Sequence, residues 1–145
     1  MLVVIATKNE LPLVEKFGYG DKQILITGVG GVNIIKALKD IPKDTYIVNI
    51  GYAGSNSISV GEQIEVGYVS TYHENVNFVE YQKYLTGNVD CYTSTDFVTH
   101  TNIKQPCVFD MELAFICAMF DNVKSIKVVS DNLSLEEYSK KIKLS

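Results

Sequence analysis

The sequence of 145 residues contains no arginine, because all thirteen of its basic residues are lysine. Arginine is the side chain usually chosen to hold a phosphate or a carboxylate through two parallel hydrogen bonds. Its absence disfavours a site for free phosphate, although lysine or backbone amides can substitute for it. An AT-rich genome would produce the same absence.

Long apolar runs, paired cysteines and an excess of positive charge are also missing. No apolar run is long enough to span a bilayer, and the N-terminal stretch MLVVIATKNE reaches Lys8 too early for a secretory signal. The three cysteines, Cys91, Cys107 and Cys117, lack CxxC spacing, so we expect reduced thiols in a cytoplasmic protein. The net charge of -4 gives no general attraction to nucleic acid or to an anionic membrane.

Four short apolar runs rich in β-branched residues predict buried strands of an α/β sheet. They cover residues 2–7, 23–28, 46–51 and 126–131. Between the second and third runs, residues 31–41 have apolar positions at helical spacing after a glycine-rich entry.

The remaining patterns predict further strands and two helices. Residues 57–73 alternate with a period of two, which indicates antiparallel or mixed strands. Residues 109–120 are expected to form a buried helix. The stretch LSLEEYSKKIK predicts a closing helix whose capping box pairs Ser134 with Glu137. Because no repeat or linker interrupts the chain, we expect one domain over residues 1–145.

Each of the four buried runs is followed by an acid or by small residues. Glu10 follows the first, GVGG (28–31) the second, GYAG (51–54) the third, and Asp131 ends the fourth. Ligands of open α/β sheets bind at the carboxyl ends of strands, so these ends predict a site for a compact polar molecule. The glycine turn lacks G-x-G-x-x-G spacing, because Asn33 stands at the third glycine position, which favours a generic ligand turn over NAD.

Residues 108–120, VFDMELAFICAMF, contain two acids in an otherwise apolar stretch. Burial of an unpaired carboxylate is costly. We expect Asp110 to cap the start of the helix through backbone N–H groups, and Glu112 to bind the hydroxyls of a polyol. Asp131 is either an Asx turn or a general acid whose pKa is raised by burial. The spacing alone predicts that Glu10 is a solvated acid in the first turn of a helix.

Histidines and aromatic residues give weaker signals. His73 and His100 lie far apart with no ligand-like cluster around them, so we expect no metal and no cofactor. Phe97 follows a polar run and fits either a core position or a stacking platform.

Six motifs in this order carry a family resemblance: ITGVGGVN, IVNIGYAGS, VGEQIEVGYVSTYHE, TSTDFV, FDMELAFIC and VVSDN. With them the sequence resembles the purine nucleoside phosphorylase/uridine phosphorylase superfamily, and within it the 5'-methylthioadenosine/S-adenosylhomocysteine nucleosidases. The motifs span nearly the whole chain. The resemblance implies a nucleoside phosphorylase-like fold, in which a central twisted mixed β-sheet is flanked by helices.

The resemblance also implies roles for individual residues. Glu112 would accept hydrogen bonds from the ribose hydroxyls, with Met111 packed on the sugar. Asp131, beside Ser130, would protonate the departing purine, and Glu10 would activate the attacking water. The other implied positions bind the base or line the site through backbone: Phe97, Val98, Gly30, Ala53 and Gly54.

The implied activity is that of a purine nucleoside N-glycosidase, which hydrolyses a nucleoside such as 5'-methylthioadenosine or S-adenosylhomocysteine to free base and sugar. A nearby carboxylate stabilises the positive charge that develops on the sugar, and protonation of the base improves the leaving group. The partner would be a small nucleoside, without nucleic acid or membrane. The resemblance further implies a homodimer in which the neighbouring subunit completes the sugar pocket.

Two alternatives stay open, and the chain departs from the family in places. A phosphorylase could use Lys8 or backbone amides for phosphate, and a trimmed homologue could bind a nucleoside without catalysis.

The chain is shorter than typical members, with a short segment between Tyr72 and Cys91 and a short loop after Asp131. Tyr52 and Leu113 also stand where small residues are common. We therefore expect a more open pocket or one shaped for another nucleoside.

Overall fold

The computed structural model describes residues 1–73 and 78–144. Its strands are β1 (Leu2–Ile5), β2 (Ile24–Ile26), β3 (Ile47–Ser55), β4 (Gln63–Thr71), β5 (Gln82–Tyr84), β6 (Val89–Thr93), β7 (Cys107–Asp110) and β8 (Val123–Asp131). Its helices are the 3-10 helix η1 (Lys8–Glu10) and the α-helices α1 (Leu11–Lys16), α2 (Gly31–Leu38), α3 (Leu113–Met119) and α4 (Leu135–Leu144). Residues 74–77, in the segment that we expected to be short, lie outside the described residues.

The strands form one mixed sheet, part of which closes on itself. Strands β2, β1 and β3 are parallel neighbours. Strand β8 pairs with β3 in parallel and with β4 antiparallel, β4 pairs with β6, β6 with β7, and β7 returns to β3. Strands β3, β8, β4, β6 and β7 therefore form a closed ring of hydrogen-bonded strands. The register places Gly54, near the end of β3, beside Asp131 at the end of β8.

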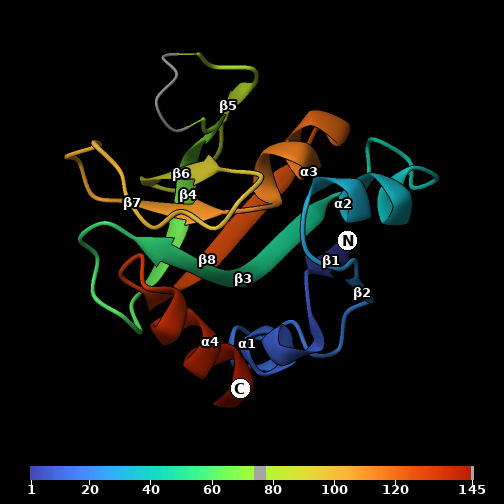
Figure 1. Cartoon of the computed structure of the whole chain (residues 1–145). Helices are drawn as coiled ribbons and strands as arrows, with labels where there is room; N and C mark the ends of the chain where they lie inside the picture. The colour runs from blue at the N-terminus through green and yellow to red at the C-terminus, as the bar shows by residue number, and fades with distance from the viewer. Residues whose placement is uncertain (74–77, 145) are drawn as a thin grey trace.

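Helices cover the sheet from two sides, as Figure 1 shows, with α2 and α3 away from α1 and α4. The larger core cluster includes Ile34 and Leu38 of α2 together with Leu113 and Ile116 of α3. A second cluster packs Leu13 and other residues of α1 against β1, β3 and β8. The expected α/β fold, with a central mixed sheet flanked by helices, is confirmed. The four apolar runs and the alternating stretch coincide with β1, β2, β3, β8 and β4.

The prediction of one helix over residues 109–120 was wrong at its start. Phe109 and Asp110 belong to β7, which pairs with the end of β3 and with β6, and α3 begins only at Leu113. All four residues of β7 are buried. Because a short, fully buried run has no exposed face, its periodicity does not distinguish a strand from a helix.

The closing helix α4 begins as its cap predicted. The Glu137 N–H donates to the Ser134 hydroxyl over 3.3 Å, as expected for an N-cap. The Glu137 carboxylate accepts a hydrogen bond of 3.3 Å from the Asn132 N–H. This half of the capping box is therefore made with the loop before the helix. Within residues 1–73 and 78–144, no helix is long and apolar enough to cross a membrane.

Candidate active site

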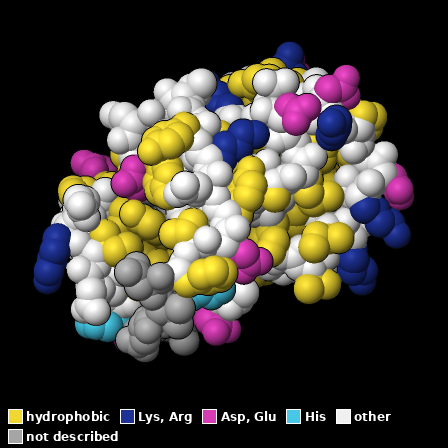
Figure 2. All heavy atoms as spheres, turned by 90° about the horizontal axis from the view of Figure 1, so that it is seen from above, with side chains coloured by type: hydrophobic (Ala, Val, Ile, Leu, Met, Phe, Trp, Pro, Cys, Tyr) yellow, Lys and Arg dark blue, Asp and Glu magenta, His cyan; other side chains and the backbone are white. Residues whose placement is uncertain are grey.

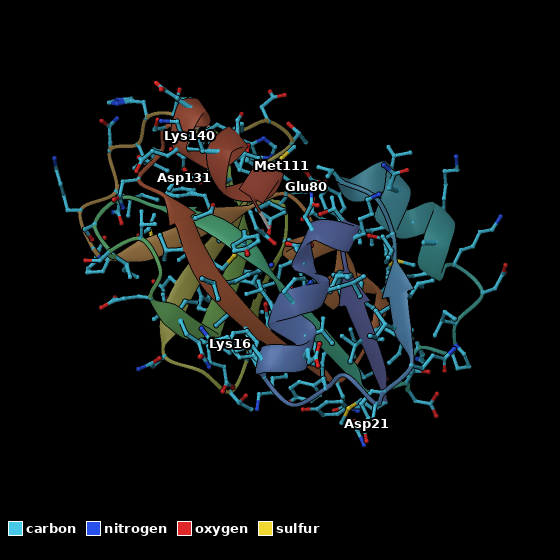
Figure 3. The ribbon with its side chains drawn as sticks, turned by 90° about the horizontal axis from the view of Figure 1, so that it is seen from below. Lys16, Asp21, Glu80, Met111, Asp131 and Lys140 are labelled. Atoms are coloured by element: carbon cyan, nitrogen blue, oxygen red, sulfur yellow. The ribbon has the colours of Figure 1, made fainter. Side chains whose placement is uncertain are left out.

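Two adjoining cavities open where β1, β3, β7 and β8 end. The first contains about 490 Å³ of empty space, a volume that includes open solvent at its mouth. Its walls include Glu10, Met111, Glu112, Asp131 and Tyr138. The second cavity shares Phe97, Met111, Gly54 and Asp131 with the first and adds Val98 and Leu133. In Figure 3, Asp131 lies at the end of β8 next to α4.

Glu10 is buried, with 6% of its surface exposed, so the prediction of a solvated acid was wrong. Its Oε1 accepts hydrogen bonds from the N–H groups of Ala6 (2.9 Å) and Thr7 (3.2 Å), and its Oε2 accepts from the Tyr52 N–H at 2.9 Å. Burial raises the pKa of Glu10, while these hydrogen bonds and the charge of Lys127 oppose the rise. The carboxylate is thus fixed at the edge of the cavity.

Glu112 stands between β7 and α3, at the N-cap position of the helix. Its Oε2 accepts a hydrogen bond of 2.8 Å from the Gly30 N–H, which connects it to the glycine turn after β2. Burial raises the pKa of Glu112 to about 7, and the charge of Asp110 adds to the rise, while Lys127 opposes it. The other oxygen of Glu112 is available to a hydroxyl group in the cavity.

Asp131 ends β8 and is fully buried. The Ser130 hydroxyl donates to its Oδ1 at 2.6 Å, and the Leu133 N–H donates to its Oδ2 at 3.0 Å. The second bond forms the Asx turn that was one of the two interpretations of Asp131 from the sequence. Asp131 therefore both forms this turn and lines the cavities. Burial raises the pKa of Asp131, and the hydrogen bonds from Ser130 and Leu133 oppose this. A raised pKa favours the protonated form that a general acid requires.

Asp110 takes part in a buried ion pair that the sequence analysis missed. Its Oδ2 lies 3.1 Å from Nζ of Lys127 and also accepts a hydrogen bond of 2.8 Å from the Leu113 N–H. Its Oδ1 accepts a bond of 2.6 Å from the Thr93 hydroxyl. The expected capping of α3 by Asp110 is therefore confirmed. Burial alone would lower the pKa of Lys127, but the charges of Asp110, Glu112 and Glu10 raise it overall, so this lysine is a permanent cation beneath the cavity.

The remaining predicted residues lie on the same walls. Ala53, Gly54, Met111 and Ser130 line the first cavity, Phe97 lines both, and Val98 lines the second. Gly30 acts through Glu112, and its neighbour Val29 is the residue that lines the cavity. Tyr138 of α4 was missed, and its ring centroid lies 5.1 Å from that of Phe97. Among the described residues, no group of three or more His, Cys, Asp or Glu could hold a metal ion.

Comparison with known proteins gives a result for structure and none for sequence. No protein-family model matches the chain, and no curated protein matches it. Solved nucleosidases do match the structure, at 12–18% sequence identity among the most similar structures. This identity is low, so the similarity establishes the fold.

Three of these structures illustrate the similarity. The MTAN (5'-methylthioadenosine/S-adenosyl homocysteine nucleosidase) of Chlamydia trachomatis has a TM-score of 0.75 and 15% identity, over 99% of this chain and 90% of that one. The futalosine hydrolase of Helicobacter pylori has a TM-score of 0.74 and 13% identity, over 99% and 91%. The S-adenosylhomocysteine nucleosidase of Streptococcus pyogenes has a TM-score of 0.73 and 15% identity, over 99% and 89%. The fold implied by the sequence resemblance is confirmed.

Proposed function

We propose that residues 1–145 form a single-domain purine nucleoside N-glycosidase, which hydrolyses a nucleoside to free base and sugar. The observation that carries this proposal is the meeting of Glu10, Glu112 and Asp131 around one cavity, although they are far apart in the chain. The fold supports it, because the similar structures described above are nucleosidases and a futalosine hydrolase, and solved forms of the chlamydial MTAN are bound to MTA or to adenine.

The two cavities suit the two halves of a nucleoside. The base would occupy the second cavity, against Phe97 and beside the backbone of Val98. The ribose would occupy the first cavity, with its hydroxyls donating to Glu112 and with Met111 packed on the ring. Asp131 then stands where both cavities meet, which is where the glycosidic bond would lie.

In this arrangement each acid has a separate task. Asp131, protonated and oriented by Ser130 and Leu133, would give its proton to the departing base, and an acid placed in this way contributes roughly 10²–10⁴-fold in rate. The negative charges of Glu10 and Glu112 would stabilise the cationic sugar of the transition state. Glu10, held by three backbone N–H groups, would finally accept a proton from the attacking water.

The charge distribution favours water over phosphate as the nucleophile. No lysine lines either cavity among the described residues, and Lys8 is exposed. The cation that lies beneath the first cavity, Lys127, is paired with Asp110 at 3.1 Å. A phosphate dianion entering this space would face the carboxyl groups of Glu10, Glu112 and Asp131 as well as the paired Asp110, with no free lysine among the described lining residues to offset their charge.

We further propose that the protein is a homodimer. The face of the molecule seen in Figure 2 shows clusters of hydrophobic side chains. Helix α2 exposes 73% of Val32 and 50% of Ile35, and Val29, which lines the first cavity, is 40% exposed. A second copy packed on α2 would thus also cover the mouth of the cavity. A Val32→Glu variant that sediments as monomer, from a wild type that sediments as dimer, would support this interface.

A cytoplasmic location is part of the same proposal. The cysteines Cys91, Cys107 and Cys117 are all buried and unpaired with one another, as is usual for proteins of a reducing compartment.

The experiment that tests the activity is incubation with a panel of purine nucleosides, with and without phosphate, and detection of free base. We expect release of base that phosphate does not stimulate, starting with the 5'-thioadenosines that the matching nucleosidases are named for. Asp131→Asn should lower turnover at least about 100-fold without loss of folded protein. Asp21→Asn is the matched control, because Asp21 is exposed and lies far from Asp131 in Figure 3. Stimulation of base release by phosphate would show that the reaction is phosphorolysis and not hydrolysis. An active Asp131→Asn enzyme would show that Asp131 is not the general acid.

A further inference from the structure

Glu112 holds the N-cap position of α3, but within the described residues its side chain makes no capping hydrogen bond to the helix. A side chain at this position ordinarily accepts from the N–H of the second or third residue of the helix. Here its Oε2 accepts instead from the Gly30 N–H at 2.8 Å, and the residue lines the first cavity. The N–H groups in the first turn of α3 must therefore have other partners.

These partners come from the backbone and from two other side chains. The N–H groups of Phe115 and Ile116 both donate to the Glu112 carbonyl, at 3.1 and 3.2 Å. The Leu113 N–H donates to Oδ2 of Asp110 at 2.8 Å. The first turn then has one N–H group left, at the second residue of the helix, where a capping side chain would ordinarily bind.

Thr93 of β6 supplies the partner of this last group. Its Oγ1 accepts a hydrogen bond of 3.0 Å from the Ala114 N–H. The same hydroxyl donates to Oδ1 of Asp110 at 2.6 Å, and because a carboxylate only accepts, this bond directs the hydroxyl proton away from Ala114. Thr93 pairs with Asp110 across β6 and β7 and is 3% exposed. It is therefore a buried acceptor that reaches α3 from outside the helix.

We propose that Thr93 is a positioning residue for Glu112, because by occupying the Ala114 N–H it leaves the Glu112 side chain free to face the sugar. Without the Thr93 hydroxyl, the Ala114 N–H would be buried and unpaired, which is costly. The N-cap side chain is the usual partner for this donor, and the helix dipole favours a negative charge there. Glu112 would then turn toward its own helix and leave Gly30. The inference rests on the proposed function, in which Glu112 binds the ribose.

The first test follows the Gly30 N–H, which reports the position of Glu112 without any ligand. Thr93→Val removes the hydroxyl and keeps the branched side chain, whereas Thr93→Ser keeps the hydroxyl. Hydrogen exchange at Gly30 should be at least about tenfold faster in Thr93→Val than in the wild type, and within about twofold in Thr93→Ser. The Tyr52 N–H, which donates to Glu10 at 2.9 Å, is the internal reference and should not change. An unchanged rate at Gly30 in Thr93→Val overturns the proposal.

The second test measures the sugar contact. Calorimetric affinities of a ribonucleoside and of its 2',3'-dideoxy form are compared in an Asp131→Asn background. Thr93→Val should weaken binding of the ribonucleoside about tenfold, the lower end of the value of a hydrogen bond to a charged group, and leave binding of the dideoxy form within about twofold. In combination with Glu112→Gln it should add little, because both changes remove the same contact. Equal losses for the two ligands, or losses that add, overturn the proposal.

Thr71→Val is the matched control. Thr71 pairs with Thr93 in the sheet, and it is not among the described residues that line either cavity. Its hydroxyl also accepts backbone N–H groups, from Glu80 at 2.9 Å and from Tyr81 at 3.1 Å. Thr71→Val should therefore lose stability without a change in exchange at Gly30 or in sugar affinity. Equal effects of Thr71→Val and Thr93→Val would show that Thr93 acts only through stability, which overturns the proposal.

Thr93→Cys serves where Thr93→Val does not fold, because a thiol sulfur is a weak acceptor. It should speed exchange at Gly30 about two- to fivefold, and no change there overturns the proposal. Failure of the glycosidase is seen separately. A wild type that releases no base from any nucleoside overturns the glycosidase, while exchange at Gly30 still decides the role of Thr93.

Discussion

Nζ of Lys127 lies 3.1 Å from Oδ2 of Asp110, and neither side chain is more than 2% exposed. The pair lies inside the ring of strands, one partner on β8 and the other at the end of β7. The charges of Lys127 and Asp110 are thus both buried away from water, next to the acids that line the cavity. Lys127 offsets part of the charge of Asp110, and as a neighbouring cation it opposes the rise in the pKa of Glu10 and of Glu112.

Replacement of Lys127 by methionine should destabilise the protein by about 3–5 kcal/mol, because the charge of Asp110 would remain buried without its partner. Urea denaturation measures this loss. Lys124→Met is the matched control on the same strand, since Lys124 and Glu65 are 3.9 Å apart and about one-third exposed, and its cost should stay within about 1 kcal/mol. The double variant Lys127→Met/Asp110→Asn should regain part of the lost stability. A single variant as stable as the control would contradict the importance of the pair.

Alanine at Gly51 should inactivate the site while leaving the sheet intact. A Cβ atom there would lie 2.6 Å from Oε2 of Glu10, so the carboxylate would have to move. Because misplacement of a catalytic group by about 1 Å can cost on the order of 100-fold, we expect at least a tenfold loss of base release. Gly20→Ala is the control, since its new Cβ would meet neighbours no closer than 3.6 Å. Full activity in Gly51→Ala would show that Glu10 does not need its present position.

Glu112→Gln should weaken binding of a ribonucleoside by about 1.5–3 kcal/mol, the value of a hydrogen bond to a charged acceptor. Affinity for the matching 2',3'-dideoxynucleoside, which has no sugar hydroxyl to donate, should hardly change. Isothermal titration with both ligands, in an Asp131→Asn background that prevents turnover, measures the difference. Equal losses for the two ligands would separate Glu112 from the sugar hydroxyls.

Stability should fall as pH rises from about 5 to 8. Burial and the charge of Asp110 raise the pKa of Glu112 from its ordinary 4.5 to about 7. The folded state therefore holds this proton more tightly than the unfolded state, so the contribution is complete below about pH 4.5 and is lost as the pH rises through about 7. Between these limits the wild type should lose about 1–3 kcal/mol more stability than Glu112→Gln, measured by urea unfolding at several pH values. Glu15→Gln, at an exposed position, should follow the wild type.

The sequence predicted the parts of the structure that depend on local pattern. The β-branched runs identified β1, β2, β3 and β8, and the residues that follow those strands meet because the strands end at one edge of the sheet. The helix over 109–120 began too early, since nothing within the stretch shows that Phe109 pairs with β3. Glu10 was taken as solvated because the backbone groups that enclose it, such as the Tyr52 N–H, are far away in sequence.

Lys127 and Tyr138 are two residues near the cavity whose roles were not predicted from the sequence. Lys127 did give a signal, as a lone cation between Ile126 and Val128 in a strand read as buried, and its acidic partner could have been sought on that basis. Tyr138 gave none, because the face that a short terminal helix turns toward the protein depends on tertiary packing. The closure of the strand ring could not be predicted from the sequence either, since it depends on which strands, distant in the chain, become neighbours.

The strand ring also determines where the molecule can associate with other chains. Among the described strands, only β2 and β5 have a single neighbour in the sheet, and each is three residues long. Such short edges present few unpaired backbone groups, so they are poor templates for strand addition and for amyloid-like growth. Contact between copies must then depend on side chains, which makes self-association open to tuning by point substitutions.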